Sequence, residues 1–199
     1  MCSSDLNSEK TGLRQRVGYF GTQNGVYFQL NDSTKSFVMR TYISGSVDDV
    51  TRKVDQSSWN GDKLDGTGPS GLTLDLTKPQ ILWMDFEWLG VGSVRCGFII
   101  NGQYIVCHTY NTANVYGSSV YMTTAILPVR YEITNTSATA SSSSMKQICS
   151  SVVSEAGFEE AKAQSVVRRT AVLATIGNTF LPLVSIRLNS RDRKSTRLN

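Results

Sequence analysis

The chain has 199 residues, a formal net charge of +4 and 40% hydrophobic residues. Its lysines and arginines are scattered, which does not argue for a nucleic-acid partner, and no run approaches the ~18 apolar residues of a membrane-spanning helix. A single histidine and the lack of any CxxC pair argue against a zinc–thiolate site and against catalysis that needs two imidazoles, so we expect no metal and no cofactor.

The two ends of the chain resemble translations of one common sequencing adapter, read on opposite strands. The matching segments are residues 1–6 (MCSSDL) and residues 192–199 (DRKSTRLN). Because both ends match together, we interpret them as artefacts and leave them out of the fold reasoning. A natural basic tail is the alternative for the second segment. We expect the natural protein to be cut at both ends.

Residues 7–135 show short β-type runs separated by Gly, Asn, Asp and Ser, a pattern typical of a sandwich or barrel. The expected strands cover residues 17–20, 26–30, 36–43, 46–55, 72–76, 80–89, 94–100, 103–110, 120–124 and 129–134. Residues 56–71 (QSSWNGDKLDGTGPSG) are turn-rich. We predict an all-β fold, an antiparallel β-sandwich of the jelly-roll or concanavalin-like kind.

In residues 80–89 (QILWMDFEWL), every second side chain from Leu82 to Trp88 is apolar. Since successive side chains of a strand point to opposite faces, Trp83, Asp85 and Glu87 share one face. The face that we expect to be buried carries Leu82, Met84, Phe86 and Trp88. The face of Trp83 is then expected to meet solvent, a partner or a ligand.

Residues 94–110 predict a hairpin, because Asn101-Gly102 is the preferred pair for a type I′ turn. With this two-residue loop, the expected cross-strand pairs are Ile100 with Gln103, Phe98 with Ile105, and Cys96 with Cys107. Cα atoms of such a hydrogen-bonded pair lie about 5.5 Å apart, within disulfide range. Two packed thiols are favoured over a disulfide, since free cysteine is among the most buried residue types.

A polar stretch at residues 136–144 (TSATASSSS) predicts a linker, followed at residues 145–191 by an incomplete second β segment. Residues 145–155 are ambiguous between helix and strand, and the pattern slightly favours a strand. Further along, we expect a helical turn at residues 158–165 and strands at residues 170–176 and 183–188.

Asp85 and Glu87 form the best candidate acid pair, because side chains at i and i+2 of a strand emerge from one face. The string WMDFE resembles the E-x-D-x-E strand of laminarinase-type glycosidases, in which the first Glu is the nucleophile. Trp83 stands at that position, so the double-displacement reaction has no attacking group. A solvated sheet face is the favoured interpretation. The alternative is a glycan-binding surface of Trp83, Asp85, Glu87 and Trp59.

Two other groups are candidates for chemistry. Asn60, Asp62 and Asp65 could place oxygens around calcium, but Asx residues beside glycine are above all turn formers. Cys107 and His108 are adjacent, yet neighbours in an extended strand point to opposite faces, so a thiolate–imidazole pair is not expected. Neither group predicts a catalytic centre.

Most of the chain resembles a family of uncharacterised phage virion proteins from environmental viral sequence. The strings that carry the resemblance are VGYFGTQNGVYFQL, WNGDKLDGTGPSG, LGVGSVRCGFIINGQYIVCH, SSVYMTTAILPVRYEI and MKQICSSVVSEAGFE. The resemblance implies a structural component of a tailed phage, associated with the tail, fibre or baseplate and located in the virion. It offers no catalytic residues that could be carried over.

We therefore expect a non-enzymatic structural or adhesion module. Its partners would be other virion proteins, further copies of the chain in a homo-oligomer, and a host-surface glycan. The alternative is a glycan-binding or degenerate laminarinase-type sandwich. A true hydrolase would need a second carboxylate about 5–9.5 Å from Glu87.

Overall fold

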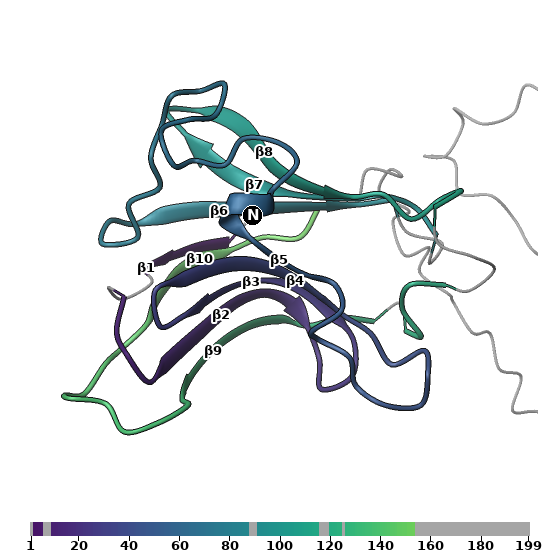
Figure 1. Ribbon diagram of the computed structural model, residues 1–199, viewed down its shortest axis with the longest axis horizontal. Helices are drawn as coiled ribbons and strands as arrows, with labels where there is room; N and C mark the ends of the chain where they lie inside the picture. The colour runs from purple at the N-terminus through teal and green to yellow at the C-terminus, as the bar shows by residue number, and fades with distance from the viewer. Residues whose placement is uncertain (1, 6–8, 88–90, 116–119, 125, 154–199) are drawn as a thin grey trace, which may run out of the picture. The chain divides into compact units, whose positions relative to one another are not determined.

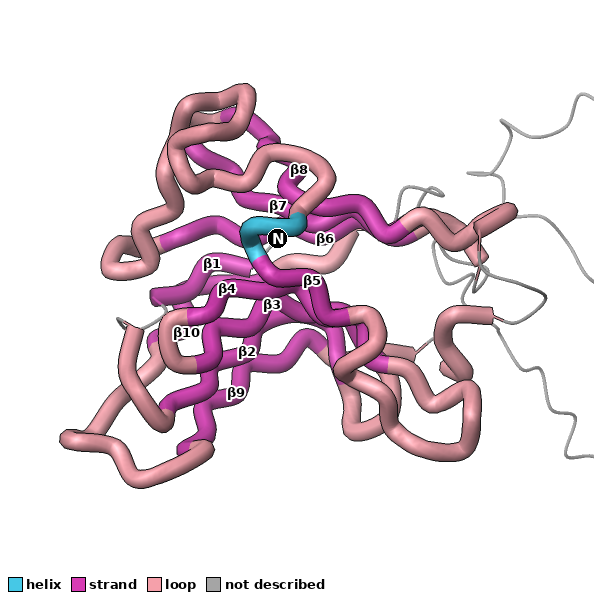
Figure 2. The backbone as a smooth tube through the Cα atoms, in the orientation of Figure 1, coloured by secondary structure: helices cyan, strands magenta, loops and turns pink. Residues whose placement is uncertain are grey.

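A computed structural model describes residues 2–5, 9–87, 91–115, 120–124 and 126–153. In these residues the chain forms two antiparallel five-stranded sheets and a single 3₁₀ turn, η1 (Gln56–Ser58). The sheets face each other across an apolar layer (Figures 1 and 2). The predicted all-β antiparallel sandwich is thus confirmed.

The first sheet, called sheet I, has the strand order β10-β1-β6-β7-β8. Its strands are β10 (Lys146–Ser150), β1 (Cys2–Asp5), β6 (Gln80–Phe86), β7 (Val94–Ile100) and β8 (Gln103–Tyr110). β1 lies within the segment that we interpret as adapter-derived, and it pairs with both β6 and β10. β10 begins the segment that the sequence assigns to a second β region, and it joins this sheet.

The second sheet, called sheet II, has the order β5-β4-β3-β2-β9. Its strands are β5 (Lys53–Asp55), β4 (Thr34–Arg40), β3 (Gly25–Asn31), β2 (Leu13–Phe20) and β9 (Val129–Asn135). The strands bow so that their concave side faces away from sheet I (Figure 1). Sheet II therefore has an inner face toward the core and a concave outer face.

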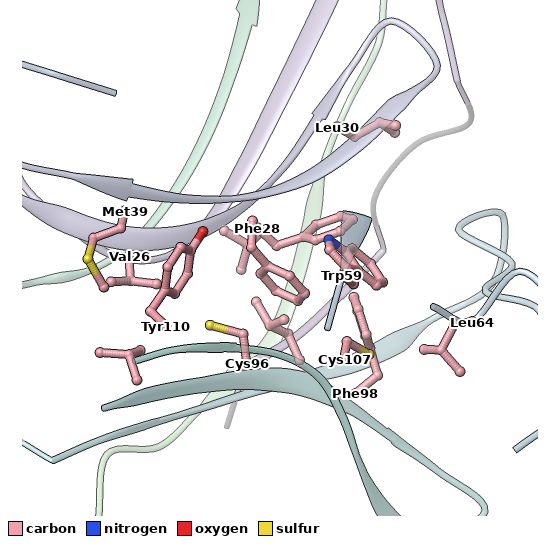
Figure 3. Packing of buried hydrophobic residues seen from close by; sticks show 14 of the residues in the cluster. Val26, Phe28, Leu30, Met39, Trp59, Leu64, Cys96, Phe98, Cys107 and Tyr110 are labelled. Atoms are coloured by element: carbon pink, nitrogen blue, oxygen red, sulfur yellow. The ribbon is translucent and has the colours of Figure 1, made fainter. Parts of the chain in front are cut away.

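The core lies between the sheets and is dominated by aromatic rings. Phe28 of β3 is fully buried and packs edge-on against Phe37 of β4 and Phe98 of β7, with ring centroids 5.5 and 5.3 Å away. The ring centre of Trp59 lies 4.8 Å from that of Phe37, and its indole N–H donates to the Val54 carbonyl. Figure 3 shows Phe28, Trp59 and Phe98 in this core. The edge-to-face contact of Phe28 with Phe98 joins the two sheets and stabilises them beyond simple burial.

The β7–β8 hairpin confirms the predicted turn, with positive φ at Asn101 (54°) and Gly102 (76°). The pairs of Ile100 with Gln103 and Phe98 with Ile105 are also as predicted. The expected pairing of Cys96 with Cys107 is wrong. A β-bulge between Cys96 and Gly97 places Cys96 opposite His108 and leaves Cys107 as the extra residue. Both cysteines are buried free thiols, as the sequence favours.

Gly97 makes this bulge possible, because an added Cβ would lie 1.9 Å from the Ile105 carbonyl oxygen. We expect Gly97→Ala to lower the free energy of unfolding by about 1–3 kcal/mol, since the clash is with backbone. Gly21→Ala is the control, because its Cβ would meet nothing closer than 3.9 Å. Urea denaturation of both variants checks the difference. Equal midpoints would contradict the proposed role of Gly97.

Three expected strands are largely or wholly missing from the described residues. Of residues 46–55, only β5 is a strand. Residues 72–76 make one isolated bridge, although Leu74 and Leu76 point into the core as their alternation predicts. Residues 120–124 form no strand in their described positions, yet Tyr121 and Met122 are buried. Apolar side chains here fill the core from irregular backbone.

The predicted linker at residues 136–144 crosses from β9 of sheet II to β10 of sheet I. It is fixed by Lys10, whose ammonium donates to the Ser141 carbonyl (2.5 Å) and hydroxyl (2.8 Å), the Ser142 carbonyl (3.2 Å) and the Ser143 hydroxyl (2.8 Å). The expected elements at residues 158–165, 170–176 and 183–188, and the artefact at residues 192–199, lie outside the described residues. The described residues contain no helix that is long and apolar enough to cross a membrane.

Candidate functional site

The structure does not bring the four residues of the glycan-binding alternative together on one surface. Trp59 lies in the core, 2% exposed, and Trp83 lies on the outer face of sheet I, only 8% exposed and beside Tyr104. Asp85 also lies on β6 and forms an ion pair with Arg95. Glu87 follows the strand and accepts the Ser93 N–H at 2.9 Å. Two of the four side chains are thus engaged in local structure, and neither indole is an open stacking surface.

The calcium candidates hold turns instead. The Asp62 carboxylate accepts backbone N–H groups from Leu64 (2.8 Å) and Ser70 (2.7 Å). Burial opposes ionisation of Asp62, but these hydrogen bonds outweigh it, so its pKa lies below the usual value. Asp65 accepts from the N–H and hydroxyl of Thr67. Within the described ranges, no group of three His, Cys, Asp or Glu side chains could hold a metal ion.

Residues 60–62 cover the free edge of β8. The amides of Gly61 and Asp62 donate to the Cys107 and Val106 carbonyls, each at 2.9 Å. The Asn60 side chain continues this pattern, because its Nδ2 donates to the Thr109 carbonyl and its Oδ1 accepts the Thr109 N–H, both at 2.8 Å. A side-chain amide thus replaces one more residue of an edge strand, which blocks pairing with other chains.

The bulge changes the surroundings of Cys107 and His108. Cys107 belongs to the core, and the His108 ring packs edge-on against core residue Tyr110 at 4.5 Å, so the expectation of opposite faces for the two neighbours is wrong. Burial lowers the pKa of His108 to about 4. Burial, assisted by the charge of Asp62, raises the pKa of Cys107 to about 12. At neutral pH both groups are uncharged, and a protonated thiol is a poor nucleophile.

The outer face of sheet II carries a network of charged and aromatic side chains that we call the arginine cluster. Its members are Arg16, Phe20, Tyr27, Arg40, Asp49, Arg130 and Glu132. Strand register explains why they meet, since directly paired residues share a face. Arg16 is paired with Glu132 and with Gln29, and Gly18 is paired with both Tyr27 and Arg130.

Two carboxylates tie the three guanidinium groups together. Glu132 lies 3.2 Å from Arg16 and 2.6 Å from Arg130. Asp49, from the loop between β4 and β5, lies 2.9 Å from Arg40 and 3.8 Å from Arg16. Arg16 therefore bridges both acids, and the charges alternate from Arg130 to Arg40.

The same guanidinium groups lie over aromatic rings. Arg16 and Arg40 each lie 5.2 Å from the centre of the Tyr27 ring, and Arg130 and Arg40 lie 5.3 and 6.0 Å from that of Phe20. Both rings are fully buried beneath the charges. Cation–π attraction and ion pairing together hold the arginine side chains in place on a face that no second sheet of the described residues covers.

The arginine cluster was not predicted from the sequence, although the sequence of β2 carries one signal of it. Arg14, Arg16, Gly18 and Phe20 alternate with the inner residues of β2, which are Leu13, Gln15, Val17 and Tyr19. Such a pattern is also produced by any solvated face, and the partners Asp49 and Glu132 lie far away in the chain. Chemically, the cluster offers more cations than carboxylates and no nucleophile, an arrangement suited to binding an anion.

The fold and this site define the protein as an all-β sandwich with a charged, aromatic outer face. No known protein family matches the chain. No curated protein and no solved structure matches it either. The resemblance to phage virion proteins therefore stays a prediction.

Proposed function

We propose that this chain is a non-enzymatic structural or adhesion module of a phage particle, associated with the tail, fibre or baseplate and acting through its surfaces. The arginine cluster is the observation that carries the proposal. Arginine and the aromatic residues are the types that dominate binding energy at protein surfaces, and here a rigid network holds them on an outer face. The sequence strings given above supply the phage assignment.

The side chains that could act as acids, bases or nucleophiles instead make contacts within the sandwich. His108 packs against Tyr110, and the two core thiols are protonated. Asp62 binds amides of its own loop, and Asp85 is paired with Arg95. These contacts support binding rather than catalysis as the role of the described residues.

A module of this kind is expected to assemble with further copies of itself. Within the described residues, β9 is an edge strand of sheet II, and exposed edges need pairing or covering. We expect light scattering to give the mass of a trimer or ring. A stable monomer at high concentration would count against assembly. Lys78→Glu, far from an edge strand in sequence and 74% exposed, is a control that should leave the mass unchanged.

A further inference from the structure

We infer that the arginine cluster is a binding site for a carboxylate-bearing sugar, such as a uronic acid. The inference rests on the proposed adhesion function and names the ligand class of that surface. It moves the glycan site from the β6 strand of sheet I, where the sequence suggests it, to the concave outer face of sheet II.

The charges of the cluster do not balance. The alternating row begins at Arg130, passes through Glu132, Arg16 and Asp49, and ends at Arg40. Both ends of the row are therefore cations, and the side chain between these two ends is the neutral ring of Phe20. Within the described residues, three guanidinium groups thus face two carboxylates, and the excess positive charge attracts an anion to this face.

Among the described residues, the end arginines contribute one unpaired donor, on Arg40, and one accessible guanidinium group, on Arg130. The Nε of Arg40 is buried and has no hydrogen-bond partner within the described residues. Arg130 donates from Nη2 to Glu132 at 2.6 Å, and its side chain is 39% exposed, the most accessible of the three guanidinium groups. A planar guanidinium with free donors matches a carboxylate in bidentate geometry. Arg130 is therefore the residue that meets the ligand.

The arrangement of the rings distinguishes an acidic sugar from a neutral one. Neutral sugars gain much of their affinity by stacking on exposed aromatic faces. Phe20 and Tyr27 are fully buried under the guanidinium groups, so that source of affinity is closed. The affinity must come from charge. A rigid pyranose also loses less conformational entropy on binding than an acidic peptide does.

The test is a calorimetric titration of the full chain with an oligomer of galacturonate, compared with the neutral galactose oligomer of equal length. We expect binding of the acidic oligomer alone, weakening as salt rises. Arg130→Gln should reduce the affinity by about tenfold or more, because a charged hydrogen bond is lost. Arg95→Gln is the matched control. Arg95 is also paired with a carboxylate, but it lies on sheet I, and its loss should leave the affinity unchanged.

Three results would overturn the inference: no binding of the acidic oligomer, equal binding of the neutral one, or equal affinity in Arg130→Gln. Tighter binding of a poly-glutamate peptide would assign the site to a protein partner instead and overturn it as well. The mass measurement separates this inference from the proposed function. An assembled chain that binds no uronate removes only the sugar site, whereas a monomer that binds it removes only the assembly.

Discussion

Replacing Phe28 with alanine is expected to lower the free energy of unfolding by about 3–5 kcal/mol, the largest effect of any single substitution considered for this chain. The ring is fully buried and contacts aromatic rings of both sheets, Phe37 on its own and Phe98 on the opposite one. Its removal leaves a cavity at the interface between the sheets, which bowed strands cannot close by a small shift.

Chemical denaturation measures this effect directly. Ile126→Ala is the control, because Ile126 is 87% exposed and its truncation should change stability by no more than about 0.5 kcal/mol. A loss below about 1 kcal/mol for Phe28→Ala would show that the two sheets do not share one core.

The second large effect is a loss of stability in mild acid that depends on His108. Burial lowers the pKa of this residue from 6.5 to about 4 in the folded chain. Between those values the unfolded chain binds a proton at His108 and the folded chain does not, so stability falls as the pH falls. The shift corresponds to about 3 kcal/mol lost by pH 4, and the loss is complete once the folded state is protonated too.

The measurement is the free energy of unfolding at pH 7 and at pH 4.5, for the unsubstituted chain and for His108→Gln. The carboxylates titrate in both proteins, so the difference between them isolates the histidine. We expect the substituted chain to lose less stability on acidification. Parallel pH profiles for the two proteins would mean that His108 is protonated in the folded state or reaches solvent.

Local patterns predicted the architecture well, because period-two alternation and turn chemistry act over a few residues. The hairpin at Asn101-Gly102 was recovered for this reason. On β6, Leu82 is buried and Met84 and Phe86 pack against the core as predicted, while Trp88 lies outside the described residues. The pairing of Cys96 was wrong because a bulge adds one residue to a strand without any change in composition. Gly97 leaves room for the bulge, and the amides of Gly61 and Asp62 satisfy the Cys107 and Val106 carbonyls beside the extra residue.

The candidate site was much harder to predict. The sequence suggested Trp83 and Trp59 as aromatics of an alternative glycan-binding surface, and both indoles are buried in the fold. The arginine cluster depends on which strands are neighbours in sheet II. Glu132 reaches Arg16 only because β9 pairs with β2 across more than half of the described chain. Periodicity shows which face a residue occupies, but it does not show which distant strand lies beside it.

The cover over β8 by residues 60–62 also limits how the chain can misassemble. Fibril growth needs a row of unpaired backbone amides and carbonyls with which a strand of the next molecule can pair. At β8, Asn60 and its neighbours already occupy part of that row. A variant that lost this amide would present a seeding surface. We therefore expect Asn60 to protect the solubility of the chain during storage and heating, rather than its folding.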